Sequence, residues 1–468
     1  MSTSSTDRDL SLQHVDETVG KRDSSSEREV EKDTPPQSEP APPAPPAAPA
    51  IPPPPNGGLQ AWLQVFGGFL FVLNTWGMAN AFGVFQTYYA TTLLTESSQS
   101  SISWIGSIQG FLLLFVGVFC GRAFDAGYFY PVAGTGIFLS VFGMMMTSLG
   151  SEYYQIFLAQ GLCLGLGSGF LFTPSISLVG TYFSTRRGLA TGIAASGSSV
   201  GGIIFPVLIR RLIKTAGFPW AVRAMAFIML ATLLLGISLL KPRLPPRKSG
   251  PVVDVAAFRD PAYTTFVIGL ALGFMAFFIP FFYAESYALN IGVDTELSFY
   301  TLSIMNAAGM VGRLVPNAIG DVLGPLNIIL PCTYISGITI LAWIAAKTLG
   351  GLLATSILYS FFSGGLMALP PAILVSLSPS LNQIGVRVGM ALTIGSLGVL
   401  IGSPIAGAIL AGQSGGSSSG SHDHEGEAGV HGLEFSGTLA FTGVALLVCG
   451  GFMSATRVVR KGLRWEKV

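Results

Sequence analysis

Charged residues are scarce in this sequence: Asp, Glu, Lys and Arg together make up 10% of its 468 residues. Soluble domains of ordinary composition hold about 25%. Half of the chain is hydrophobic, so we expect most of its surface to face a lipid bilayer. The formal net charge is only +1, which is not the basic excess that nucleic-acid binding requires. We therefore predict a membrane partner and no nucleic-acid partner.

Cysteine and histidine are also few, with four residues of each. The cysteines lie far apart, without a Cys-x-x-Cys pair or a metal-ligand spacing, and we interpret them as small core residues. The histidines fall in the N-terminal tail and in a Gly- and Ser-rich loop at 412–434. A metal site in that loop is the alternative, but its glycines leave nothing to fix a coordination geometry. We predict no metal site.

Arrangements typical of enzymes are missing from the apolar part of the chain. No Ser, His and acid grouping occurs there, and no Gly-rich nucleotide loop follows a strand pattern. These absences argue against an enzyme, against a cofactor and against ATP-driven pumping by this chain alone.

What the chain has instead is a series of long apolar runs. Crossing a hydrocarbon layer of about 30 Å takes about 20 helical residues, and runs of that length recur from Gly57 onward. We predict an all-α membrane protein with twelve transmembrane helices in two six-helix bundles. The predicted spans are 60–86, 103–121, 129–149, 153–179, 188–212, 218–240, 263–289, 298–319, 326–346, 351–376, 388–411 and 435–456.

A polar, proline-containing linker at 241–260 follows the sixth span and divides the predicted bundles, 57–240 and 261–456. Residues 1–56 are charged and then rich in Pro and Ala, so we expect a disordered cytoplasmic tail. A solvated spacer is the favoured interpretation of this tail, and docking to a partner protein is the alternative. Residues 457–468 form a basic cytoplasmic tail.

Lysine and arginine are concentrated on one side of this predicted topology. Cytoplasmic loops hold the excess of these residues, and placing both termini inside puts most of the loop Lys and Arg on the cytoplasmic side. The basic cluster from Arg210 to Arg223 is an exception, because it falls on the predicted outer side. The chain is therefore expected to be a multi-pass membrane protein with both termini in the cytoplasm, and the plasma membrane is the default location.

Glycines spaced four apart recur in spans two, four, five and eleven, for example at Gly197 and Gly201. Such small residues let helices approach closely in lipid. Static packing is sufficient for any one pair, but their concentration favours helices that rock against each other.

Charge inside the spans is rare, and Arg313 in span eight is the chief case. An arginine at a helix centre costs about 2.5–3.5 kcal/mol on insertion scales and usually faces a cavity. Its guanidinium could bind a carboxylate bidentately, and the alternative is an anchor that reaches the cytoplasmic interface. Glu285 is the candidate proton site if it is buried, because burial disfavours a charged carboxylate. The alternative for Glu285 is a side chain that faces an outer vestibule.

Uncharged polar and aromatic residues complete the candidate substrate site. Asn80 in span one and Asn306 in span eight can donate and accept hydrogen bonds, although polar residues that hold two helices together would look the same. Trp76 belongs to a group of aromatic residues whose rings would favour a cargo larger and more apolar than a short acid. The others are Tyr88, Phe277, Phe278, Phe281, Phe282, Tyr283, Phe361 and Phe362.

The stretch from Tyr182 to Gly201 places two adjacent arginines, Arg186 and Arg187, against a Gly-rich apolar helix. This pattern resembles the fifth-helix signature of the monocarboxylate porter family, within the major facilitator superfamily, and the chain is similar to the fungal branch of that family. The resemblance implies two bundles that work by alternating access, with the arginine pair at a gate.

Two short loops, 121–127 and 317–324, resemble the Gly-x-x-x-Asp loop motif of the same superfamily. By resemblance, Asp125 and Asp321 each bond a neighbouring helix end and hold the outward-open state. The second copy has Asn317 in place of glycine, and both copies lack the basic residues that usually follow the aspartate.

The segments Ser303-Ile304 and Met310-Val311-x-Arg313 align with the eighth helix of animal monocarboxylate transporters. In that family the arginine contacts the substrate carboxylate. The family's proton-relay aspartate is Gly309 here, and its first-helix lysine is Asn80. The resemblance therefore favours an acidic substrate but lacks the coupling residues of lactate-type symport.

Together these observations predict a secondary active transporter of small or medium organic molecules, and organic acids in particular, with efflux of a secondary metabolite as the favoured direction. Proton-coupled uptake of a monocarboxylate or another nutrient is the first alternative. A non-transporting membrane sensor or scaffold, docked through its N-terminal tail, is the alternative from another class.

Overall fold

The computed structural model describes residues 54–183, 187–245, 254–378, 384–414 and 434–462. Several predicted features lie outside these residues: most of the tail at 1–56, Arg186, the middle of the linker, most of the His-containing loop and the end of the basic tail.

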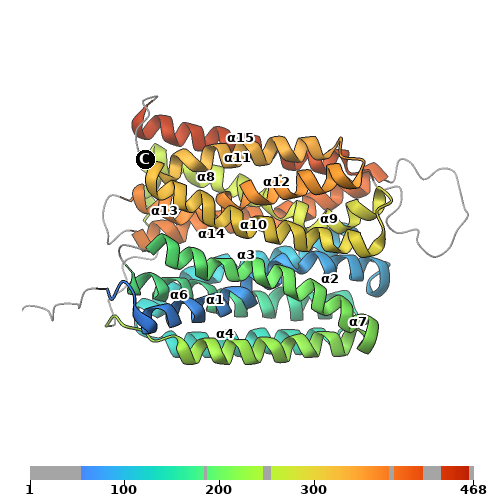
Figure 1. Ribbon diagram of the computed structural model, residues 1–468, viewed down its shortest axis with the longest axis horizontal. Helices are drawn as coiled ribbons and strands as arrows, with labels where there is room; N and C mark the ends of the chain where they lie inside the picture. The colour runs from blue at the N-terminus through green and yellow to red at the C-terminus, as the bar shows by residue number, and fades with distance from the viewer. Residues whose placement is uncertain (1–53, 184–186, 246–253, 379–383, 415–433, 463–468) are drawn as a thin grey trace, which may run out of the picture. The chain divides into compact units, whose positions relative to one another are not determined.

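Nearly all of the described chain is helical, and the helices run alongside one another (Figure 1). Helices suit a bilayer because each one satisfies its own backbone N–H and C=O groups. The elements are α1 (Gly58–Asn80), α2 (Phe82–Tyr88), the π-helix η1 (Tyr89–Leu93), α3 (Gln99–Asp125), α4 (Phe129–Thr147), α5 (Tyr153–Ile156), the π-helix η2 (Phe157–Cys163), α6 (Leu164–Tyr182), α7 (Arg187–Leu239), the 3-10 helix η3 (Val255–Arg259), α8 (Pro261–Phe277), α9 (Ile279–Asn290), α10 (Thr295–Leu323), α11 (Pro325–Trp343), α12 (Leu349–Ala368), α13 (Pro370–Ser376), α14 (Ile384–Ser414) and α15 (Ser436–Lys461).

Ten helical segments of the described chain are long and apolar enough to cross a membrane. One of them, Gly188–Leu239, is long enough for two crossings, and Gly217 inside it has a φ of 77°, which separates two helices. α10 is a continuous helix of 29 residues, but it is not among these ten segments. It contains the charged residues Glu296, Arg313 and Asp321, which make it less apolar. These helices are consistent with the twelve predicted spans, and the predicted all-helical membrane fold is confirmed.

Proline sets several helix boundaries, because it fits the first turn of a helix and disrupts the interior. Pro261 opens α8, and the preceding Asp260 caps that helix by accepting the N–H of Ala262 at 3.0 Å. Pro280 and Pro370 stand at the starts of α9 and α13, so the seventh and tenth predicted spans are each broken into two helices.

Glycine allows α1 and α7 to pack closely. A Cβ built on Gly77 would lie 2.8 Å from the Cα of Gly201, and one built on Gly201 would lie 2.5 Å from the backbone oxygen of Leu73. No larger residue fits either position without a backbone shift, as expected for helices that associate through small residues.

The most extensive contacts between the N-terminal half of the chain (α1–α7) and the C-terminal half (η3–α15) are those of α7 with α10, α3 with α14, and α2 with α9. We call the end at which α7 and α14 begin the linker end (left in Figure 1) and the opposite end the far end. The halves touch at both ends of this interface. At the linker end a Cβ built on Gly389 of α14 would lie 3.1 Å from Val118 Cγ1 of α3. At the far end the hydroxyls of Ser103 and Tyr283 are 2.7 Å apart.

Candidate functional site

Arg313 lies in α10, and its side chain is directed at α7 in the other half of the chain. The residue is 5% exposed, and its Nη1 donates to Ser198 Oγ at 2.7 Å and to Ser199 Oγ. Within the described ranges, no carboxylate lies at ion-pair distance from it. Neutral hydroxyls do not balance a charge, so the guanidinium is a buried cation without a countercharge, an arrangement that costs free energy.

Asn306 lies seven residues before Arg313 on α10, about 10 Å along the helix axis, and also faces α7. Its Nδ2 donates to the backbone oxygens of Leu302, at 3.0 Å, and of Gly202, at 3.2 Å. A Cβ built on Gly202 would collide with the side-chain amide of Asn306. The absent side chain at Gly202 is therefore what makes room for this amide.

Asn80, the last residue of α1, is fully buried and donates from Nδ2 to the backbone oxygen of Ser198 at 3.4 Å. The amide nitrogens of Asn80 and Asn306 thus both bond backbone carbonyls, which only accept, and this fixes which way each amide points. Neither Oδ1 has a partner in the described part of the chain. We call the three predicted residues and their partners on α7 the α7 polar cluster: Arg313, Asn306, Asn80, Ser198, Ser199 and Gly202.

Trp76 lies one turn before Asn80 and connects the α7 polar cluster to a row of aromatic rings. Its ring stacks on Phe278, with centroids 6.0 Å apart and an interplanar angle of 7°. Phe278 contacts Phe282 at 5.6 Å, and Phe282 contacts Phe82 at 5.0 Å. The row therefore crosses from one half of the chain to the other.

Glu285 in α9 is 8% exposed, so the burial on which its predicted role depends is present. Its Oε2 has no hydrogen-bond partner among the described residues. Its polar neighbours are Thr87 of α2 and Arg210 of α7, not Arg313 or the two asparagines. Glu285 therefore belongs to a separate polar site.

Three of the four predicted gating residues, Asp125, Asp321 and Arg187, lie at the linker end. A Cβ built on Gly188, in the first turn of α7, would lie 2.9 Å from Asp321 Oδ2, so this carboxylate faces the start of a helix from the other half. Helix starts attract negative charge. Asp125 is exposed at the end of α3. Arg187 is the first residue of α7, and Arg186 lies outside the described residues.

The basic cluster that the sequence placed on the outer side has partners at the far end. Lys214 Nζ is 3.8 Å from Glu296 Oε1, and the guanidinium of Arg210 lies 4.4 Å from the ring centroid of Phe299. Both contacts join α7 to α10. Lys214 and Arg210 thus attach the two halves to each other, which is a physical reason for basic residues at the far end.

Sequence reasoning missed Ser198 and Ser199, although it singled out the glycines beside them. Their hydroxyls point across the interface because they share a face of α7 with Gly202. Two adjacent serines in a Gly-rich helix were the available signal, but serine is also common where helices simply pack.

No group of three or more His, Cys, Asp or Glu that could hold a metal occurs among the described residues. The histidines of the predicted flexible loop lie outside them. Cys120, Cys332 and Cys449 are buried and Cys163 is half-buried, all as free thiols.

A membrane-embedded helical fold with a buried polar cluster between its halves is the architecture of a transporter. The sequence profile of the Major Facilitator Superfamily matches residues 61–344. The chain belongs to this superfamily, so it is a membrane transporter and not an enzyme.

Curated fungal proteins are similar over most of their length. The MFS-type transporter dbaD of Emericella nidulans is 45% identical over 396 residues, which cover 84% of this chain and 85% of that protein. The aspyridones efflux protein apdF of the same organism is 38% identical over 359 residues, covering 76% and 73%. The crystal structure of a peptide transporter, POT, in complex with sulfate is similar in fold, with a TM-score of 0.66 at 13% identity over 87% of this chain and 97% of that one.

Proposed function

We propose that this transporter exports a small or medium organic acid by alternating access. The observation that carries the proposal is the buried guanidinium of Arg313, whose hydrogen-bond partners are the neutral hydroxyls of Ser198 and Ser199. An anionic cargo would supply the missing countercharge, and its carboxylate could accept two hydrogen bonds from the guanidinium. Binding would replace bonds from the guanidinium to neutral hydroxyls by bonds to a carboxylate, in which donor and acceptor are both charged.

The rest of the cluster favours a cargo with a hydroxyl group and an aromatic or otherwise apolar body. The unpartnered Oδ1 atoms of Asn80 and Asn306 are buried acceptors, and a site with unmet acceptors favours ligands that bring donors. The ring of Trp76 and its aromatic row offer an apolar wall. Export is supported by the name of apdF, an efflux protein for aspyridones, and we extend that direction of transport to this chain.

Alternating access would move two six-helix bundles, 57–240 and 261–456, against each other. The bonds from Arg313 and Asn306 to α7 join these bundles, so they would break and re-form in each cycle. Membership of the monocarboxylate porter family, cytoplasmic termini and a plasma-membrane location are parts of the same proposal, supported by the signature at 182–201 and by the Lys and Arg distribution.

The test is retention of a labelled hydroxylated aromatic acid, beside its neutral methyl ester, in cells with and without the protein. We expect the protein to lower retention of the acid and not of the ester. Arg313→Gln should abolish the difference, because a hydrogen bond to a charged group contributes about 1.5–3 kcal/mol, and Arg313→Lys should restore part of it. The control is Arg211→Gln, because Arg211 is an exposed arginine of α7. Equal handling of acid and ester, or full activity of Arg313→Gln at normal membrane level, contradicts the proposal.

Proton-coupled uptake is the second candidate function, and the buried Glu285 with its unpartnered Oε2 favours it. A carboxyl at such a site can bind and release a proton as its surroundings change. Uptake of the acid that rises as external pH falls, and that loses this dependence in Glu285→Gln, would replace export by symport. pH-independent flux in both proteins would leave export as the function.

A further inference from the structure

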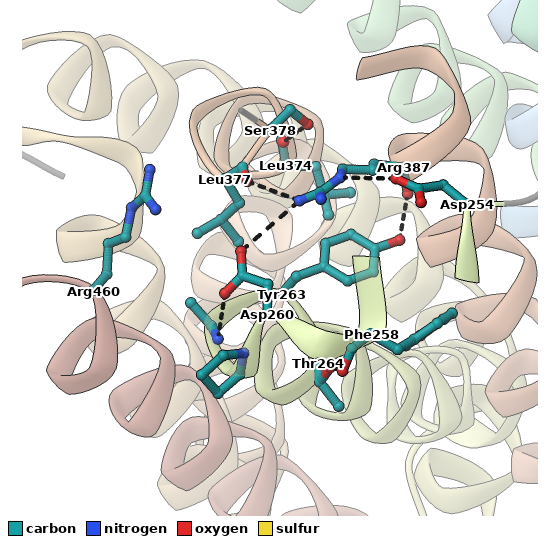
Figure 2. A network of polar contacts seen from close by, with 12 residues as sticks. Asp254, Phe258, Asp260, Tyr263, Thr264, Leu374, Leu377, Ser378, Arg387 and Arg460 are labelled. Carbon is teal, nitrogen blue, oxygen red and sulfur yellow. Dashed lines mark hydrogen bonds and ion pairs between the residues drawn. The ribbon is translucent and has the colours of Figure 1, made fainter. Parts of the chain in front are cut away.

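A network of polar contacts at the linker end, outside the α7 polar cluster, is centred on Arg387 in the first turn of α14 (Figure 2). The side chain of Arg387 is 7% exposed. Its Nε is 3.6 Å from Asp254 Oδ2, its Nη1 is 3.8 Å from Asp260 Oδ2, and the same Nη1 donates to the backbone oxygen of Leu377 at 3.3 Å. Asp254 and Asp260 belong to the end of the inter-half linker, and Leu377 directly follows α13.

Tyr263 strengthens this attachment from the first turn of α8. Its hydroxyl donates to the backbone oxygen of Arg387 at 2.7 Å, and its ring centroid lies 5.4 Å from the guanidinium carbon of the same arginine. A cation over an aromatic face is attracted to it. Arg387 is therefore held through both its backbone and its side chain, and it binds the end of the linker to the start of α14.

The beginning of the linker is attached to the other half of the chain. The Nε2 of Gln64 donates to the backbone oxygen of Leu239 at 2.9 Å, while its Oε1 accepts the N–H of Lys241 at 2.7 Å. The hydroxyl of Tyr182 donates to the backbone oxygen of Lys241 at 2.7 Å. The linker is thus fastened at both ends, by Gln64 and Tyr182 to the N-terminal half and by Arg387 to the C-terminal half.

The turn that Arg387 fixes is also where the halves meet. Gly389, two residues further along α14, packs against Val118 of α3. A residue that orients the first turn of α14 relative to α8, α13 and the linker also orients this contact. Opening of the linker end would have to separate α3 from α14 at this place.

We infer that Arg387 is a positioning residue of the transport cycle, because by tying the linker to the first turn of α14 it holds the contact between α3 and α14 closed. This inference rests on the alternating access of the proposed function. Loss of the arginine leaves α14 free to move away from α3, so the linker end opens more often. The α7 polar cluster is untouched, so the intrinsic affinity of the open state for cargo stays the same while the balance between closed and open states shifts.

Disulfide trapping in the full-length protein tests this directly. A Cβ built on Gly389 lies 3.8 Å from Val118 Cβ, and the mean Cβ separation in disulfides is about 3.8 Å. Val118→Cys and Gly389→Cys, introduced together after replacement of the four native cysteines by serine, should therefore cross-link when the linker end is closed. The rate of cross-linking in membranes, without cargo, reports that closed population.

We expect Arg387→Gln to lower the cross-linking rate about fivefold or more, the lower end of usual coupling between sites. Arg387→Lys should recover part of the rate, and Asp254→Asn should lower it in a protein that keeps the arginine. The matched control is Arg460→Gln, since Arg460 lies at the same end (Figure 2) but bonds the backbone oxygen of Ser376 at 3.2 Å.

An unchanged rate in Arg387→Gln at normal membrane level overturns the inference. If that variant fails to reach the membrane, an unchanged rate in Asp254→Asn overturns it equally. Cross-linking is measured without cargo. A transport assay in which acids are not exported would therefore contradict the proposed function, whereas an unchanged cross-linking rate would contradict the role of Arg387. A half-saturating cargo concentration that rises in Arg387→Gln would also count against a role confined to positioning.

Discussion

Removing the two hydroxyls that bond Arg313 should tighten cargo binding. Ser198 and Ser199 accept hydrogen bonds from the guanidinium of Arg313, so an incoming carboxylate must displace them. The double change Ser198→Ala and Ser199→Ala takes these bonds away from the empty transporter. The cargo-bound transporter loses less stabilisation, because there the cargo has replaced the serines as the partner of Arg313. The empty state is therefore destabilised more than the bound state, and the cargo binds with higher affinity.

The size of the effect follows from the bonds lost. Each hydrogen bond to a charged group contributes about 1.5–3 kcal/mol, and about 1.4 kcal/mol is a factor of ten in affinity. Part of the lost stabilisation is recovered as the empty site relaxes. We therefore expect the dissociation constant of an acidic cargo to fall about tenfold in the double variant.

Equilibrium binding of a labelled acid to purified transporter measures this constant. Ser196→Ala is the control, because Ser196 lies on the same helix but donates to the backbone oxygen of Ile193 at 2.7 Å. Weaker binding in the double variant would mean that the serines contact the cargo themselves. An unchanged constant would mean that Arg313 is not the anion site, and either result refutes the reasoning.

Gly202→Ala should lower flux about tenfold or more, although alanine favours helix by about 1 kcal/mol, because its Cβ collides with Asn306; a thermal melt separates this loss from unfolding. Trp76→Leu should reduce affinity for aromatic acids about two- to tenfold, as lost ring contacts predict, and leave short acids unaffected in competition binding. Lys214→Ala should change flux less than fivefold, because its ion pair with Glu296 is exposed; a larger loss would make that pair a gate.

The sequence was sufficient for the fold class, because long apolar runs have few other solutions in lipid. It also predicted three members of the α7 polar cluster. Arg313 and Asn306 are separated by two helical turns and so share a face, and a buried polar residue in a membrane span needs a partner. The partner itself was not predictable, since the pairing of α7 with α10 depends on how the two halves meet.

The residues at the linker end show a different limit. Asp321 was selected by resemblance, and the structure places its carboxylate near Gly188. Arg387 falls between the predicted spans 351–376 and 388–411 and was not among the candidate site residues. Nothing in its neighbourhood in sequence indicates that Asp254, more than a hundred residues away, lies 3.6 Å from it. Long-range polar contacts of this kind come from packing and leave no periodic signal in the sequence.

The kind of bond that Arg313 makes across the interface between α7 and α10 bears on how easily the two halves can part. Within the α7 polar cluster, the described bonds between the halves run from side chains to hydroxyls and backbone oxygens, as at Ser199 and Gly202. An ion pair buried there would be broken at a cost of about 3–5 kcal/mol for each unpaired charge. A cation opposed by neutral acceptors has less to lose when the halves part, and most to gain when an anion arrives. If the cargo is the proposed acid, the absence of a carboxylate near Arg313 in the described chain would therefore couple its binding to the movement of the halves.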